Sequence, residues 1–387
     1  MIYVIVITAK SHKISKLQEV IMKKILAVIL SSLIICAAAG CGSNQKSESA
    51  SKAETTQAAT EAVPEATVAT ASPAVSSDLE DTIKSHDFEG IIYAVKDGKP
   101  VASYAKGKLE NGSEITLDSP MPVGSVSKQF CAAAVLLLQE QGKLNVNDTL
   151  DKFYPDYKEG KKITLKNVLS MRSGIPEITE EAASVVTLEN SEEQNVAAIK
   201  KWVFEKPLTF EPDKDFTYTN TNYFLLSDIV AQTSGKKYID FLRENFFTKL
   251  GMTHTGSIGE LDSNPKWTLG NTYKKVDLQK GLTNGCGDLI STAADITAWI
   301  EGLSSGKVIS EESYKAMTTN YSDENNYGYG MFLNIEGGVG HYGNIGIYSS
   351  FDYINTDKKL TVTVFSNSIE PTSVQGLTSD LLTDLMG

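Results

Sequence analysis

The chain has 387 residues, a formal net charge of −12 at pH 7 and 41% hydrophobic residues. This length is sufficient for one large domain, or two interleaved ones, with a substantial buried core. The acidic balance and the scarcity of basic clusters argue against nucleic acid as a partner. No zinc-type spacing of cysteine and histidine occurs, so we expect neither a metal ion nor a cofactor. Two cysteines of the folded part, Cys131 and Cys286, are expected to be free thiols.

Residues 1–40 are typical of an export signal. Lys23-Lys24 form a basic start, residues 25–35 form an apolar run, and Ala38-Ala39-Gly40 precede Cys41. The run is shorter than the about 20 apolar residues that span a bilayer. Its end resembles a bacterial lipoprotein box, which would make Cys41 a lipidated N-terminus at the extracytoplasmic face of the membrane. A simple secretory signal with a chance cysteine is the alternative.

Residues 41–77 form a predicted tether. After the cysteine they consist almost entirely of Ser, Ala, Thr, Glu, Gln, Lys and Val, without aromatic residues, and cannot bury a core. We expect a disordered segment with an r.m.s. span of about 30–35 Å between the membrane and a folded domain of residues 78–387. Met22, directly before the basic start of the export signal, is a more natural first residue than Met1.

Strand patterns occur near both ends of the folded domain. Residues 90–96 and 101–105 flank Asp97-Gly98-Lys99-Pro100, which is a hairpin signature. Further strands are predicted over residues 327–335, 348–354 and 360–365.

The middle of the domain reads as mostly helical. Helical apolar spacing occurs over residues 222–232, 238–250 and 293–303, and a helix over residues 373–386 ends the chain. The order of elements predicts an α+β fold, in which an antiparallel sheet built from both chain ends is flanked by helices and interrupted by a mainly helical insertion. Active sites often form at such a junction.

The segment from Gly124 to Lys128 opens a long apolar stretch over residues 130–138. If that stretch is a helix, Ser125 and Lys128 share one face. A serine hydroxyl is a poor nucleophile at neutral pH, and a lysine one turn away can supply the proton acceptor that it needs. Ser-x-x-Lys also occurs elsewhere in the chain, and an ordinary buried helix capped by serine is the alternative.

Tyr218 and Asn220 form a second candidate in the loop before the helix at residues 222–232. The alternative is structural: a tyrosine packed under the loop, with Asn220 or Asn222 as the N-cap of that helix. Tyr-x-Asn also occurs at residues 353–355, where it ends a predicted strand beside a turn.

A third candidate is the segment from Gly340 to Asn344, with His341 and Gly343 at its centre. We prefer it to His254-Thr255-Gly256 because it enters the predicted sheet, where backbone N–H groups can be aimed at a substrate. Residues 338–343 also satisfy G-x-G-x-x-G, but no helix follows and no βαβ unit surrounds them, so a dinucleotide site is not expected.

Three motifs therefore follow one another along the chain: Ser125-x-x-Lys128, Tyr218-x-Asn220 and His341-x-Gly343. In this order they resemble the active-site motifs of the serine β-lactamase and penicillin-binding-protein superfamily. Tyr-x-Asn in second place is similar to the class C β-lactamase, D,D-peptidase and esterase branch. Residues 163–176, 247–255 and 285–295 are similar to other landmarks of that branch, and the likeness covers roughly residues 85–385.

The resemblance implies a β-lactamase/transpeptidase-like fold and a set of roles. Ser125 would be the acylated nucleophile, and the N–H groups of Ser125 and Asn344 would form the oxyanion hole. Asn220 would bind the amide of the acyl side chain, and His341 and Gly343 would line the substrate. Tyr218 would move protons and position water. Whether Lys128 takes the serine proton, or stays charged while Tyr218 does so, is left open by the sequence.

The substrate class implied is an amide or ester: a D-amino-acid peptide, an ester or a β-lactam. The substrate would be a small molecule or a fragment derived from peptidoglycan. Tyr342 stands where many relatives have threonine, which removes a carboxylate-binding hydroxyl and is expected to add bulk. Met171-Arg172 replaces a more usual His-Thr. Both departures favour a peptidase or esterase over an efficient β-lactamase. The alternative is a surface module that binds penicillin without turnover; the oligomeric state is open.

Overall fold

The computed structural model describes residues 75–109, 112–178, 185–187, 189–263, 281–367 and 371–387. All of them belong to one of the two units into which the chain divides, residues 61–387. The predicted export signal, Cys41 and nearly all of the predicted tether lie outside the described residues. Among the described residues, no helix is long and apolar enough to cross a membrane.

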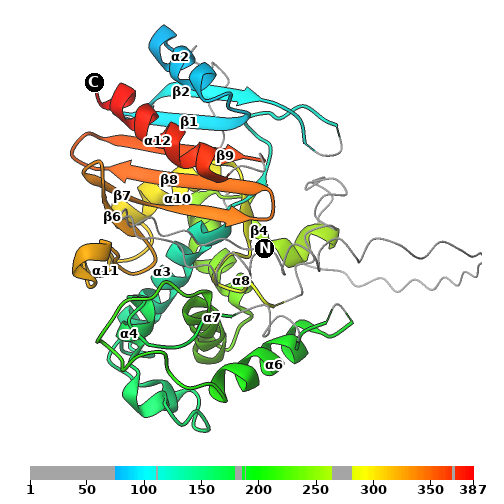
Figure 1. Cartoon of the computed structure of the whole chain (residues 1–387), viewed down its shortest axis with the longest axis vertical. Helices are drawn as coiled ribbons and strands as arrows, with labels where there is room; N and C mark the ends of the chain where they lie inside the picture. Colours follow the sequence, from blue (N-terminus) through cyan, green and yellow to red (C-terminus); the bar gives the residue numbers. More distant parts are fainter. Residues whose placement is uncertain (1–74, 110–111, 179–184, 188, 264–280, 368–370) are drawn as a thin grey trace, which may run out of the picture. The chain divides into compact units, whose positions relative to one another are not determined.

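A six-stranded antiparallel sheet joins the two ends of the domain (Figure 1). Its strand order is β2-β1-β9-β8-β7-β6, so the N-terminal hairpin pairs with the last strand and Ile92 lies opposite Val364. The predicted sheet from both chain ends is confirmed. The strands are β1 (Gly90–Lys96), β2 (Lys99–Lys106), β6 (Phe332–Ile335), β7 (Gly338–Ile345), β8 (Tyr348–Asn355) and β9 (Leu360–Ser366).

The two faces of the sheet pack against different apolar cores, because successive strand residues point to opposite sides. Ile92 and Val364 pack with side chains of α2 (Ser77–Ser85) and α12 (Pro371–Met386). Ile91 belongs to the larger core that the helical middle shares. Figure 1 shows α2 and α12 together at the end of the domain that carries β1, β2 and β9. Since both faces are covered, β1 is apolar along most of its length.

The predicted helical middle is present. Residues 222–232 lie in α7 (Asn220–Ser234) and residues 293–303 in α10 (Ala293–Ser304). The stretch predicted at 238–250 is helical but changes type, from α8 (Tyr238–Leu242) through a π-helical η4 (Arg243–Phe247) to α9 (Thr248–Leu250). The other helices are α3 (Ser127–Glu140), α4 (Leu165–Leu169), α6 (Glu192–Phe204), α11 (Glu311–Met317) and the short turns η1 (Gly124–Val126), η2 (Leu150–Lys152), η3 (Gly160–Lys162), η5 (Ile258–Ser263) and η7 (Asp323–Asn325).

Two parts of the sheet structure differ from the sequence expectation. The strand expected over residues 327–335 is confined to β6, because Gly328 N donates to Met331 O at 3.0 Å in a turn, and Tyr327 forms only an isolated bridge to Phe332. A second, small sheet was not predicted. It pairs β3 (Met121–Pro122), β5 (Leu289–Ser291) and β4 (Gly256–Ser257) in that order.

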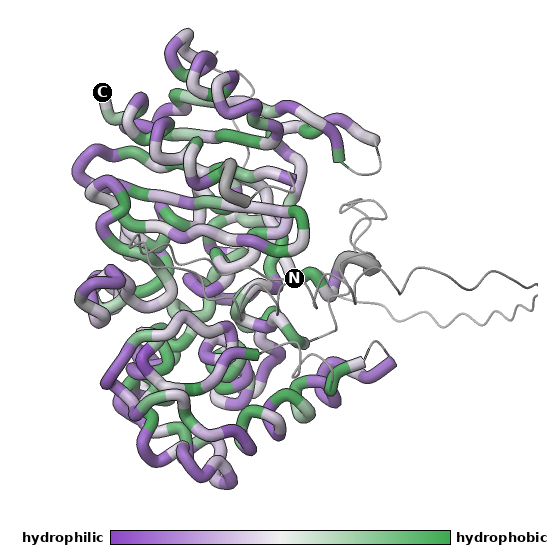
Figure 2. Tube along the Cα trace, viewed as in Figure 1, coloured by the Kyte–Doolittle hydropathy of each residue, from purple (hydrophilic) through white to green (hydrophobic). Residues whose placement is uncertain are grey.

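Helix α3 lies at the centre of the larger core. Its residues from Ser127 to Leu138 are all buried, as the absence of a polar face predicts. Phe130 stacks on Trp299 of α10 with 3.7 Å between the ring centres. Helix α6, by contrast, is amphipathic: it buries Ile199 and Val203, and hydrophilic and hydrophobic colours alternate along it in Figure 2. Because it is buried along most of its length, helix α3 offers a rigid, fully packed support for the residues at its N-terminus.

Candidate active site

Ser125 and Lys128 meet where the chain enters α3. Strand β3 leads into η1, which contains Ser125, and Lys128 lies in the first turn of α3. The Lys128 side chain is fully buried, and its Nζ lies 2.9 Å from Ser125 Oγ. The structure therefore brings the two residues of the first motif into direct hydrogen-bonding contact.

Lys128 Nζ has two further hydrogen-bond partners. They are Asn220 Oδ1 at 2.8 Å and the carbonyl oxygen of Cys286 at 2.7 Å. Both of these oxygens can only accept, whereas the Ser125 hydroxyl can accept or donate. A neutral amine would give its two N–H bonds to Asn220 and Cys286, and its lone pair would then face Ser125. An ammonium group would instead donate to all three oxygens.

Tyr218 lies beside this lysine. Lys128 Nζ is 4.9 Å from the centre of the half-buried Tyr218 ring. The ring stacks on Phe332 of β6, with 6.3 Å between centres and an interplanar angle of 5°, and meets Tyr327 edge-on at 5.9 Å. Aromatic packing thus holds Tyr218 next to the amine of the first motif.

The N-cap of α7 differs from the sequence expectation. Thr219, rather than Asn220 or Asn222, caps this helix, with its side chain accepting from Thr221 N. Asn220 is the first helical residue, and its side chain contacts Lys128 instead of capping the helix. Asn222 is fully buried and accepts a hydrogen bond from Ser173 Oγ at 2.7 Å. The structural explanation considered for Asn220 is therefore wrong.

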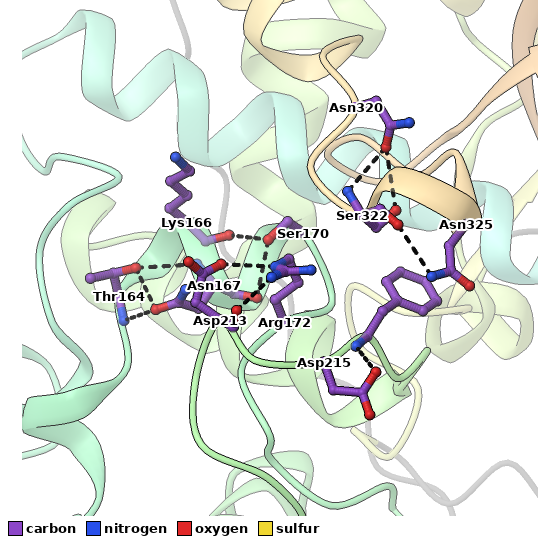
Figure 3. A network of polar contacts seen from close by, with 11 residues as sticks. Thr164, Lys166, Asn167, Ser170, Arg172, Asp213, Asp215, Asn320, Ser322 and Asn325 are labelled. Carbon is purple, nitrogen blue, oxygen red and sulfur yellow. Dashed lines mark hydrogen bonds and ion pairs between the residues drawn. The ribbon is translucent and has the colours of Figure 1, made fainter.

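A turn around Met171 supports the loop that carries Tyr218. Met171 has a positive φ of 61°, and its carbonyl oxygen accepts from Thr217 N at 3.0 Å. The neighbouring Arg172 turns away to Asp213, where Nε donates to Oδ1 at 2.8 Å (Figure 3). The Met171-Arg172 pair thus braces the loop that carries Tyr218.

Sequence reasoning missed one carboxylate in the site. Glu177 accepts from both the backbone N and the side-chain Nδ2 of Asn220, the latter at 2.8 Å. It directly follows the stretch Ser173-Gly174-Ile175-Pro176, which the family resemblance marks as a landmark. The position of an acidic residue right after that landmark was the available signal.

The backbone segments of the predicted oxyanion hole lie close together because two glycines allow it. A Cβ atom at Gly343 would lie 2.0 Å from the carbonyl oxygen of Val123 and 3.0 Å from Ser125 N. A Cβ atom at Gly124, whose φ is +48°, would lie 2.8 Å from Asn344 N. Strand β7 therefore runs directly beside η1, with the N–H groups of Ser125 and Asn344 at this contact.

His341 is enclosed. Its side chain is 1% exposed, Nδ1 lies 2.5 Å from the carbonyl oxygen of Tyr342, and Nε2 lies 3.3 Å from the hydroxyl of Tyr327. Because a carbonyl only accepts, Nδ1 carries the proton and Nε2 accepts from Tyr327. Burial, and secondarily the charge of Lys128, lowers the pKa of His341 to about 3, so the ring is neutral. Protein groups engage both ring nitrogens, and the predicted substrate contact of His341 stays a prediction.

Tyr342 does not crowd the nucleophile. Its ring stacks on Phe351 with 4.5 Å between centres, and its hydroxyl lies 3.1 Å from Thr378 Oγ1 of α12. Neighbouring residues of a strand point to opposite faces, and Gly343 is the one that faces Ser125. The expectation of added bulk in the substrate site is therefore wrong, because that bulk lies on the α12 side of the sheet.

Both cysteines of the folded domain are free and buried, as expected. Burial raises the pKa of the Cys286 thiol to about 12. The thiol is therefore protonated at neutral pH, and Cys286 serves the site through its carbonyl oxygen rather than its sulfur.

Comparison with known proteins identifies the family of this chain. A sequence model of the family described as Beta-lactamase matches residues 75–383. The protein PbpX of Bacillus subtilis (strain 168) is 28% identical over 304 residues, which cover 75% of this chain and 73% of PbpX. Protein flp of Staphylococcus aureus (strain COL) is 26% identical over 326 residues, which cover 74% of this chain and 62% of flp.

Solved structures show the same fold. The D-amino acid amidase from Ochrobactrum anthropi SV3, complexed with L-phenylalanine amide, superposes with a TM-score of 0.67 at 20% identity, over 79% of this chain and 97% of the amidase. A penicillin binding protein from Bacillus halodurans gives a TM-score of 0.66 at 19% identity, over 78% of this chain and 98% of that protein. Since the family match spans most of the chain and the fold agrees, this chain belongs to the β-lactamase family, within the β-lactamase/transpeptidase-like superfamily.

Proposed function

We propose that this protein is a serine hydrolase of the class C-related branch that acts through an acyl-enzyme at Ser125. The observation that carries the proposal is the contact between Lys128 Nζ and Ser125 Oγ at 2.9 Å. Two acceptor-only oxygens hold the same amine, so a neutral Lys128 has its lone pair directed at the serine hydroxyl. This is the arrangement that nucleophilic catalysis by serine requires.

In the acylation step, Ser125 Oγ forms a bond to the substrate carbonyl carbon while its proton passes to Lys128. The carbonyl oxygen becomes an oxyanion, which the N–H groups of Ser125 and Asn344 would stabilise. Each such donor is typically worth about 3–4 kcal/mol in the transition state. When the tetrahedral intermediate collapses, the bond to the leaving amine or alcohol breaks, and the leaving group takes up a proton through Lys128 and Tyr218.

In the deacylation step, a water molecule attacks the acyl carbon. In this proposal the Tyr218 hydroxyl relays a proton: it takes one from the water and passes its own to Lys128, whose Nζ lies 4.9 Å from the centre of the Tyr218 ring. The bond between the acyl carbon and Ser125 Oγ then breaks, and Oγ recovers a proton from Lys128. We assign acylation chiefly to Lys128 and deacylation chiefly to Tyr218.

The proposed substrates are amides or esters of the D-amino-acid type. Support comes from the fold shared with a D-amino acid amidase and with a penicillin binding protein. Tyr342 offers no hydroxyl on the Ser125 side of β7, because its side chain bonds to Thr378 on the other face. Position 342 therefore offers a substrate carboxylate no hydroxyl at the Ser125 site, and we take this as favouring amide or ester hydrolysis over efficient β-lactam hydrolysis.

We also propose that Cys41 is lipidated and anchors the catalytic domain at the extracytoplasmic face of the membrane. The support is the sequence alone: a basic start, an apolar run and small residues before the cysteine. Cell-wall fragments would be the natural substrates of a hydrolase in that location.

The function is tested by comparing the hydrolysis of three substrates by the purified domain: a D-alanyl-D-alanine peptide, a p-nitrophenyl ester and nitrocefin. We expect turnover of the peptide or the ester to exceed that of nitrocefin by at least tenfold in kcat/KM. Ser125→Ala, verified as folded by circular dichroism, should abolish each activity. A stable adduct with no turnover of any substrate would instead identify a penicillin-binding sensor.

A further inference from the structure

Glu177 makes the closest polar contact to the second motif, yet neither the three motifs nor the mechanism above includes it. Its carboxylate accepts from Asn220 N at 2.5 Å and from Asn220 Nδ2 at 2.8 Å. One residue therefore engages both the main chain and the side chain of Asn220. Asn220 in turn places its Oδ1 2.8 Å from Lys128 Nζ.

The loop that carries Glu177 is bonded to the first turn of α7. Thr221 Oγ1 donates to Pro176 O at 2.7 Å, and Ser173 Oγ donates to Asn222 Oδ1 at 2.7 Å. Together with the Asn220 contacts, these bonds engage three successive residues at the start of the helix. The position of the carboxylate is therefore fixed independently of any substrate.

The N-terminus of α7 favours a carboxylate at this place. Asn220 is the first residue of this 15-residue helix, so its backbone N–H has no acceptor within the helix. Negative charge near a helix N-terminus is stabilised by the helix dipole and by such unpaired N–H groups. Glu177 satisfies this donor and at the same time reaches the side chain of the same residue.

The orientation of the Asn220 amide follows from its two neighbours. An amide has one accepting and one donating end of nearly equal shape, so a turn of 180° about its last bond exchanges them. Glu177 only accepts and Lys128 must donate to an oxygen here. If the amide were reversed, its NH2 group would face the amine and its oxygen would face the carboxylate. Glu177 thus excludes the orientation in which Lys128 loses its acceptor.

We propose that Glu177 is a positioning residue for the first two motifs. It fixes the Asn220 amide so that Oδ1 holds Lys128 against Ser125, while the second hydrogen on Nδ2 stays available for the substrate. Three hydrogen bonds of 2.8, 2.8 and 2.9 Å link Glu177 to Asn220, Asn220 to Lys128 and Lys128 to Ser125. The inference rests on the proposed function, because it assigns Glu177 to the acylation of Ser125.

The test is a double-mutant cycle on the rate at which a fluorophosphonate acylates Ser125. Glu177→Ala and Asn220→Ala should each slow acylation by about 10- to 100-fold, which corresponds to the loss of hydrogen bonds to a charged group. The double variant should be no more than about threefold slower than Asn220→Ala, because Glu177 acts only through Asn220. Glu177→Gln, which keeps one accepting oxygen, should be intermediate.

Glu205→Ala is the matched control. Glu205 is an exposed carboxylate at the end of α6, and its removal should leave the acylation rate unchanged. Losses in the double variant that multiply would contradict the proposal. So would a Glu177→Ala protein that melts at a lower temperature but acylates at the normal rate per folded molecule, since that is the signature of a purely structural role.

A crystal structure of Glu177→Ala decides the proposal without reference to activity. We expect the Asn220 amide to turn, or the distance between Asn220 Oδ1 and Lys128 Nζ to lengthen clearly beyond its present 2.8 Å. An unchanged amide at an unchanged distance would overturn the inference. If the unmodified protein resists acylation altogether, the proposed function fails, whereas this structure still shows whether Glu177 positions Asn220.

Discussion

Gly343 and Val123 approach so closely that a Cβ atom at position 343 would lie 2.0 Å from the carbonyl oxygen of Val123. The same Cβ atom would lie 2.5 Å from Ser350 Oγ, which donates to that carbonyl at 2.7 Å. The backbone of β7 and the turn before Ser125 therefore fit together only when residue 343 has no side chain.

Gly343→Ala should push β7 away from the turn before Ser125 and displace the N–H groups of Ser125 and Asn344. Because loss of an oxyanion donor typically costs about 10²–10³ in rate, we expect acylation to slow by at least 100-fold. Gly376→Ala, in α12, is the control: its Cβ would meet nothing closer than 3.4 Å, and acylation should be unaffected. A Gly343→Ala protein with normal acylation kinetics would show that this contact does not shape the oxyanion hole.

Tyr218→Phe removes the hydroxyl but keeps the ring that stacks on Phe332. Since general acid–base groups typically contribute about 10²–10⁴ in rate, steady-state hydrolysis should slow by about 100-fold or more. If Tyr218 serves deacylation, the variant should still release a burst of p-nitrophenol from an ester and then stall as the acyl-enzyme. Stopped-flow absorbance separates the two phases. Unchanged steady-state rates would remove Tyr218 from the mechanism.

Asp352 makes stability depend on pH. It is fully buried on β8, where Oδ1 accepts from Gln129 Nε2 and from His341 N, both at 2.9 Å. Burial raises the pKa of its carboxyl to about 7. Between about pH 4 and pH 7 the folded state therefore holds a proton that the unfolded state releases, and the free energy of unfolding falls as pH rises through this window.

Asp352→Asn keeps the accepting oxygen and lacks this titration. The melting temperature of the variant relative to the unmodified protein should therefore increase from pH 4 to pH 7, by roughly 5 °C or more, and then stay level. His341, whose lowered pKa gives the opposite slope below neutral pH, is present in both proteins and cancels in the difference. A difference that is constant between pH 4 and pH 8 would show that Asp352 does not titrate in this range.

Cys41→Ser tests the proposed anchor in the organism that expresses the protein. If Cys41 carries a lipid, the unmodified protein should partition into the membrane fraction and into the detergent phase of Triton X-114, and the variant should be released. Each lipid CH2 group contributes about 0.8 kcal/mol to membrane binding, so the change should be nearly complete. Continued membrane association of the variant would argue against lipidation.

Much of the fold was predictable because its elements have strong periodic patterns. The hairpin around Asp97-Gly98, the alternation in residues 360–365 and the unbroken apolar run of α3 each led to the correct element. The strands β3, β4 and β5 were missed because two or three residues carry no recognisable period. Their pairing depends on contacts between distant segments, which a single sequence does not reveal.

The site was predictable in its motifs but not in its supporting contacts. Tyr342 was judged by residue type, although the two-residue period of a strand places it opposite Gly343. Thr219 was overlooked as the cap of α7 because four neighbouring residues can all cap a helix. Glu177 reaches Asn220 across 43 positions of sequence, and no local pattern encodes such a contact.

The measurement that most directly tests the account is peptide mapping by mass spectrometry after reaction with a fluorescent fluorophosphonate. We predict one covalent adduct per molecule, on the peptide that contains Ser125. Ser125→Ala should gain no adduct. Lys128→Ala should gain none during a brief reaction. Folded, unmodified protein that gains no adduct at Ser125, or gains it at another serine instead, would contradict the claim that Ser125 is the nucleophile.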